Sequence, residues 1–153
     1  MNTKNEHNAI ALRINNLLSE YIIIHDEVFK FSWRKIIPLP FIFKVINFHD
    51  LHEKADEILN NLEKCNDDIS RILSEVSDKE SRFAHFLSEY CLALTNTVSL
   101  LKEMLYQLYL KSKNSGDYSL SKHNSLSKEY DKAVKKYYSM GNRLNELYTE
   151  FNQ

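Results

Sequence analysis

Apolar residues recur at alternating steps of three and four residues in four separate stretches of this sequence. Such steps place the apolar side chains on one stripe of a helix, as the seam of a coiled coil or of a helical bundle requires. β-Sandwiches, barrels and doubly wound folds need frequent turn residues, whereas this chain of 153 residues has only two Gly and two Pro. The spacing therefore predicts an all-α protein. The four stripes start at Ile10, Leu51, Leu87 and Leu126.

Local sequence features predict where the helices begin and end. Proline suits the first helical turn, so we expect the second helix to start at Pro40. Residues 77–80 (Ser-Asp-Lys-Glu) match a capping box, which predicts the start of the third helix. Residues 114–117 (Asn-Ser-Gly-Asp) form the clearest loop. We expect one domain over residues 1–153, with helices at about 5–31, 40–76, 78–113 and 121–151.

Two arrangements of the second and third helices are open. No Gly or Pro occurs between Pro40 and Gly116, so these helices can form one rod of roughly 110 Å in an elongated coiled-coil dimer. Alternatively, the chain reverses near residue 78 and forms a long central helical hairpin. Five pairs of stripe residues then lie at matching heights, because the two residue numbers in each pair sum to 156. The pairs are Leu51 with Leu105, Ile58 with Val98, Leu62 with Leu94, Cys65 with Cys91, and Ile69 with Leu87. We favour the hairpin, and therefore an antiparallel four-helix bundle.

Residues suited to catalysis or to metal binding are few. His49, His52 and Glu53 lie near one helical face, but zinc needs three or four converging ligands in a suitable order. The sequence has neither the His-Glu-x-x-His order nor a Glu-x-x-His pair. It also lacks a Gly-x-Ser-x-Gly elbow, a phosphate-binding glycine loop and a dinucleotide fingerprint. We therefore expect no enzyme, no metal and no cofactor. Cys65 and Cys91 fall on apolar stripes, where we expect small buried side chains.

The overall charge is close to neutral, because 20 basic and 21 acidic residues leave a net charge of −1. We therefore expect no nucleic-acid binding. The first eight residues are polar, unlike a secretory leader, and the longest apolar run, residues 36–46, is too short to span a bilayer. These features predict a soluble, cytoplasmic protein. The abundance of Asn, Lys and Ile is typical of an AT-rich genome.

The most unusual segment is residues 31–48, which hold the only Trp, both prolines and no acidic residue. Three interpretations are open: its apolar side chains close one end of the bundle, they anchor a partner protein, or they enter a membrane interface. In the second interpretation, aromatic side chains are the anchors and neighbouring cations orient the partner. The predicted binding residues are Trp33, Arg34, Lys35, Phe41 and Phe43.

These observations together predict a non-enzymatic interaction protein that binds another protein. Inhibitors, immunity proteins, secretion chaperones and adaptors fit this description, so the expected function rests on analogy of architecture. The alternative is a peripheral membrane protein that uses residues 31–48 at the bilayer surface. A third interpretation is a homodimer formed through an exposed heptad stripe.

Overall fold

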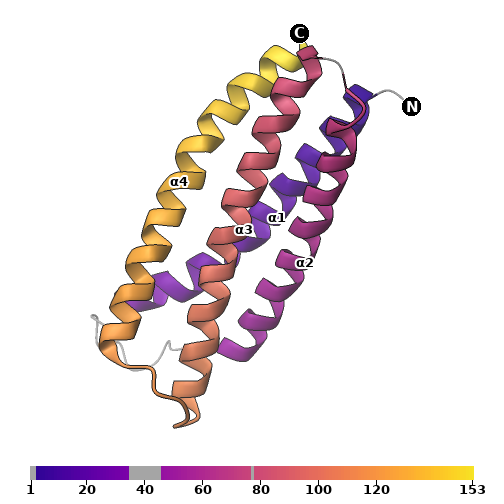
Figure 1. The fold of residues 1–153 in the computed structure, drawn as a ribbon. Helices are drawn as coiled ribbons and strands as arrows, with labels where there is room; N and C mark the ends of the chain where they lie inside the picture. Colours follow the sequence, from indigo (N-terminus) through magenta and orange to yellow (C-terminus); the bar gives the residue numbers. More distant parts are fainter. Residues whose placement is uncertain (1–2, 35–45, 77) are drawn as a thin grey trace.

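Each of the four heptad stretches forms a helix. The computed structural model describes residues 3–34, 46–76 and 78–153, and over these residues it contains helices and no strand. The helices alternate in direction, and Figure 1 shows that α1 begins at the end of the bundle where α4 finishes. The protein is therefore an all-α antiparallel helical bundle, as the spacing predicts. The helices are α1 (Thr3–Arg34), α2 (Phe48–Leu73), α3 (Asp78–Ser112) and α4 (Leu120–Asn152).

The predicted stripes form most of the core, and α3 buries further side chains beside its stripe. These are Phe83, Ala84, Tyr90, Ala93, Thr97 and Met104. On α1 the stripe is buried from Ile10 to Val28, and on α2 it is buried from Leu51 to Ile72. On α4 the stripe is less protected, because several of its members are only partly buried. These members are Leu126, Met140, Leu144 and Phe151. The heptad pattern thus predicts most of the core correctly, while α4 has one side of its stripe open.

The second and third helices form the predicted hairpin, not one continuous rod. Helix α2 ends at Leu73, where the amides of Ser74 and Glu75 donate to carbonyls of the last turn over 3.2 and 2.9 Å. Contacts between α2 and α3 confirm the register, since Ser88 donates to Asn66 and Lys102 pairs with Asp56. The residue numbers of these pairs sum to 154 and 158, close to the expected 156. Ser77 of the predicted capping box lies outside the described residues.

The prediction that the second helix runs from Pro40 to residue 76 is wrong at both ends. Ile46 and Asn47 are not helical, and α2 begins at Phe48. The side-chain oxygen of Asn47 accepts a hydrogen bond of 3.1 Å from the Asp50 amide, which satisfies a donor that the first turn leaves free. This capping bond sets the start of the helix. Pro40 itself lies outside the described residues.

The edge of the bundle between α1 and α4 is open. Helix α3 packs against each of the other three helices, and α1 also packs against α2. Within the described ranges, however, no Cα atom of α1 lies within 8 Å of a Cα atom of α4. Figure 1 shows α1 inclined to the other helices. Side chains therefore span the space between α1 and α4, and this edge contains the candidate site.

Candidate functional site

The residues predicted to bind a partner from the sequence are only partly within the described chain. The backbone of Trp33 and Arg34 continues the last turn of α1. Lys35, Phe41 and Phe43 lie outside the described residues. Docking through residues 31–48 therefore stays a prediction.

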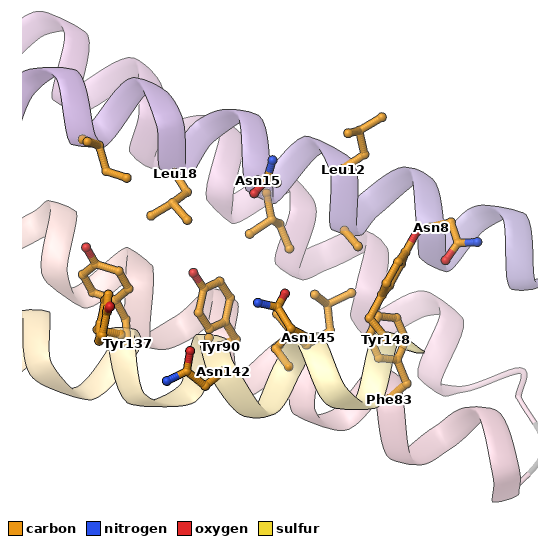
Figure 2. Close-up of a pocket in the computed structure, with 17 residues that line it drawn as sticks. Asn8, Leu12, Asn15, Leu18, Phe83, Tyr90, Tyr137, Asn142, Asn145 and Tyr148 are labelled. Carbon is orange, nitrogen blue, oxygen red and sulfur yellow. The ribbon is translucent and has the colours of Figure 1, made fainter. Parts of the chain in front are cut away.

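A groove runs along the open edge between α1 and α4, with α3 as its floor. Figure 2 shows side chains from the two helices facing each other across it. Its cavity volume is about 520 Å³, which lies in the usual range for a binding site. The residues that line it are Asn8, Ala11, Leu12, Ile14, Asn15, Leu18, Ile22, Phe83, Leu87, Tyr90, Tyr137, Tyr138, Gly141, Asn142, Leu144, Asn145 and Tyr148.

The described lining of this groove contains no charged side chain and no histidine. Because the chain is 27% charged, 17 residues would on average include about five charged ones. The lining instead combines aliphatic side chains, tyrosines and asparagine amides. Such a surface can bury an apolar ligand and can form neutral hydrogen bonds, but it offers no counter-ion to a buried charge.

One end of the groove is closed by a cluster of aromatic side chains that joins α1 to α4. The Tyr21 and Tyr130 hydroxyl oxygens lie 2.6 Å apart, and His25 Nδ1 lies 2.7 Å from the same Tyr130 oxygen. The Phe29 ring stacks on the Tyr130 ring with centroids 5.4 Å apart, and the Tyr137 ring meets the Tyr21 ring edge-on at 5.8 Å. We call this group the tyrosine clasp.

Side chains near the two chain ends close the opposite end of the groove. Asn8 Nδ2 donates to Asn152 Oδ1 over 3.0 Å, and the His7 and Phe151 rings lie 5.3 Å apart. Asn8 and Tyr21 are 13 residues apart on α1, which corresponds to about 20 Å of helix. The groove is therefore a slot of about four helical turns with a contact between α1 and α4 at each end.

The α4 wall has an open position at Gly141. A Cβ atom built there would lie 3.7 Å from Tyr90 Cε2 and 4.0 Å from the Tyr90 hydroxyl oxygen, which are ordinary contact distances. Close packing therefore does not require glycine at this position. The missing side chain instead leaves a depression beside the Tyr90 ring. Figure 2 shows this ring between Tyr137 and Asn145. We call this depression the Gly141 pocket.

The Tyr90 side chain is buried but has no hydrogen-bonding partner among the described residues. Its side chain is only 5% exposed, and no described atom donates to its hydroxyl or accepts from it. Burial raises the pKa of Tyr90 to about 12, so the phenol stays protonated at neutral pH. Three other buried tyrosines of the described chain have hydroxyl partners. They are Tyr21, Tyr118 and Tyr130.

The rims of the groove expose apolar side chains to solvent. Leu12 on α1 is 61% exposed, and Tyr138 on α4 is 70% exposed. Ile22 and Tyr148 are also exposed on the rims, so half of the large exposed hydrophobic side chains of the described chain border this one groove. A concentration of exposed apolar surface in one place marks an interaction site.

In the predicted cluster of His49, His52 and Glu53, the two histidines pack against α3, and the exposed Glu53 carboxylate lies 3.6 Å from His52 Nδ1. The His49 ring meets the Tyr109 ring at 5.2 Å, and the His52 ring lies 5.6 Å from Tyr106. Over the residues that the structure describes, no three His, Cys, Asp or Glu side chains are placed to hold a metal ion. Burial raises the pKa of the Cys91 thiol to about 12, which disfavours its reactive thiolate form.

Sequence reasoning did not find the groove. Its rim residues Leu12 and Tyr138 lie off the heptad stripes, and a single apolar residue off a stripe carries little information. The clearest available indication was Gly141, a glycine inside a strongly periodic helix. Glycine costs about 1 kcal/mol relative to alanine in such a position.

Comparison of the chain with protein-family models, with curated proteins and with solved structures finds no match. Within the described residues, none of the four helices has both the length and the apolar content needed to cross a bilayer. The function is therefore inferred from the geometry of the groove.

Proposed function

We propose that this protein is a non-enzymatic binding module that holds an amphipathic helix of another protein in the groove between α1 and α4. The observation that carries the proposal is an uncharged, partly exposed groove of about 20 Å between two helices that approach each other only through side chains. Such a groove suits a helix whose apolar residues recur at steps of three and four.

The walls of the groove favour a helix over an extended segment. Both walls are helices, whose backbone donors and acceptors are already bonded within each helix. They offer no free strand edge to which an extended peptide can add. A helical partner satisfies its own backbone and needs only to bury one apolar face. The slot is about 20 Å long between the tyrosine clasp and the Asn8–Asn152 contact, and it accommodates about 13 residues of such a helix.

A different protein fits the groove better than a second copy of this chain. Four large exposed hydrophobic side chains lie outside the groove in the described chain, and they are scattered over three helices. No described helix therefore presents outward an apolar stripe of about four turns. These four side chains are Ile23, Leu92, Tyr106 and Leu120.

The proposal is tested with a phage-displayed library of amphipathic helical peptides of about 18 residues, selected on the wild-type protein. Gly141→Leu adds a helix-favouring side chain that fills the Gly141 pocket, so we expect the selected peptides to bind it at least about tenfold more weakly. Fluorescence anisotropy with labelled peptides measures this change. Circular dichroism verifies that the variant keeps its helical fold.

Ser70→Leu is the matched control, because it adds the same side chain at an exposed position on α2, which contributes nothing to the groove. The selected peptides should bind this variant as tightly as the wild type. If no peptide is enriched, or if the enriched peptides bind Gly141→Leu and the wild type equally, the proposal is wrong.

Peripheral membrane association through residues 31–48 is the second function predicted from the sequence. Flotation of the full chain with anionic and neutral liposomes, followed through Trp33 fluorescence, tests it separately. Flotation together with a blue shift would support it, and absence of flotation would count against it.

A further inference from the structure

Building on the proposed function, we infer that the bound helix places one neutral hydrogen-bonding side chain, from Ser, Thr, Asn or Gln, in the Gly141 pocket against the Tyr90 hydroxyl. The rest of its inner face is apolar. The groove then selects both a register and a direction of the partner helix.

The Tyr90 hydroxyl faces the groove, and solvent reaches its oxygen. A helix that fills the groove covers this hydroxyl, and leaving it then without a partner is unfavourable because buried polar groups in folded proteins are nearly always bonded. Tyr90 is 5% exposed and lacks a bonding partner in the described chain, whereas Tyr21 and Tyr130 bond to each other at 2.6 Å. Figure 2 shows the Tyr90 ring in the groove between α1 and α4. A group that enters the groove can therefore supply the missing bond.

Open space lies beside that hydroxyl. The position of a Cβ atom on Gly141 lies 4.0 Å from the Tyr90 oxygen, so the open depression and the unbonded hydroxyl coincide. A partner side chain that enters this depression reaches Tyr90 without displacing any side chain at position 141. Tyr90 can donate or accept, because a protonated phenol does both.

The lining of the groove also restricts the charge of the side chain that enters it. A carboxylate can accept a bond from Tyr90, but the described lining of the groove holds no cation to pair with it. A lysine or arginine entering the groove would likewise find no carboxylate. Because burying an unpaired charge is costly, the entering group should be neutral.

The position of the Gly141 pocket makes the recognition directional. The part of α4 that lines the groove runs from Tyr137 to Tyr148, and Gly141 lies about one turn from the first of these residues and two turns from the second. A polar residue that lies off the centre of the apolar face of the partner helix can enter the Gly141 pocket in one register and one direction. Single buried polar residues fix register in the same way in coiled coils.

The test uses the tightest-binding peptide from the library as the probe. A second peptide has Leu in place of the polar residue on the inner face. The parent peptide and this Leu peptide are each titrated against the wild type and against Tyr90→Phe, which keeps the ring and removes only the hydroxyl. We expect the parent peptide to lose about three- to tenfold in affinity on Tyr90→Phe, as for one neutral hydrogen bond. The Leu peptide should bind both proteins equally.

Tyr106→Phe is the control, because it removes a hydroxyl from a half-exposed tyrosine that does not line the groove, so it should leave peptide binding unchanged. If the selected peptides carry only apolar inner faces, or if Tyr90→Phe binds the parent as the wild type does, this inference is overturned. The proposed function still stands in that case, provided that Gly141→Leu abolishes binding. If Gly141→Leu binds the peptides normally, the proposed function fails together with this inference.

Discussion

The hydroxyl oxygens of Tyr21 and Tyr130 lie 2.6 Å apart, inside the edge of the bundle where the backbones of α1 and α4 stay more than 8 Å apart over their described residues. Both side chains are almost fully buried. Their contact joins the two helices and also ends the groove. The stability of this edge and the length of the groove therefore depend on the same two side chains.

Replacing Tyr130 by Phe should destabilise the fold more than replacing Tyr21 by Phe. The Tyr130 hydroxyl contacts both Tyr21 and His25, so Tyr130→Phe removes two contacts, whereas Tyr21→Phe leaves the contact with His25. We expect the free energy of unfolding to fall by about 1–3 kcal/mol for Tyr130→Phe and by about 1 kcal/mol for Tyr21→Phe. Urea denaturation measures both values. Tyr138→Phe, at an exposed position, should change nothing, and equal stability of Tyr130→Phe and the wild type would contradict the role of the clasp.

The buried tyrosines should make the protein unstable at alkaline pH. Burial raises the pKa of Tyr21 and of Tyr130 well above the ordinary 10.0, and raises the pKa of Tyr90 to about 12. In the unfolded chain these groups lose their protons near pH 10, while the folded chain keeps them. Stability from these groups is therefore complete below about pH 10 and falls as the pH rises above it, by up to about 1.4 kcal/mol per pH unit for each group.

Urea denaturation in steps from about pH 8 to about pH 11.5 measures this dependence. Tyrosinate absorbance at alkaline pH supplies the independent check: the buried tyrosines should ionise only as the helical circular dichroism is lost. The double variant Tyr21→Phe/Tyr130→Phe should show a shallower fall of stability with pH. If these tyrosines ionise near pH 10 while the helices stay folded, then the clasp is not sealed from water.

The core and the hairpin could be predicted because they depend on periodicity alone. Steps of three and four residues place Leu62, Cys65 and Leu94 on facing stripes, and two helices joined by a short turn can pair in few registers. The observed contacts of Asn66 with Ser88 and of Asp56 with Lys102 lie close to the register expected.

The open edge could not be predicted because it depends on how large side chains pack. The spacing between two helices varies with the side chains at their contact, and here Tyr21, Tyr130 and Tyr137 meet between α1 and α4. Periodicity placed these tyrosines on stripes but contained no information on the separation of the helices. The start of α2 was missed for a similar local reason, because it is set by the side-chain oxygen of Asn47, which accepts a hydrogen bond from the Asp50 amide.

The two observed N-caps lead to a paired prediction. Asn47 caps α2 by accepting from the Asp50 amide over 3.1 Å, and Ser119 caps α4 by accepting from the Lys122 amide over 3.2 Å. We expect Asn47→Ala and Ser119→Ala each to lower the free energy of unfolding by about 1 kcal/mol. Thermal denaturation should show this as a fall in Tm of about 2–4 °C. Asn47→Asp keeps a capping oxygen and should restore most of the loss; if it does not, the cap bond is not the cause.

The two glycines of the chain should respond in opposite directions to alanine. Gly141 has ordinary helical backbone and room for a Cβ atom 3.7 Å from Tyr90 Cε2, so Gly141→Ala should stabilise the fold by about 1 kcal/mol through its higher helix propensity. Gly116 has a φ of +79° in the loop after α3, and its Cβ would lie 3.4 Å from Leu110 Cβ. Gly116→Ala should therefore destabilise the fold by about 1 kcal/mol or more. Urea denaturation of the two variants and of the wild type measures both signs. A loss of stability in Gly141→Ala would mean that packing against Tyr90 requires glycine, and the Gly141 pocket would then be too small to receive a side chain from a partner helix.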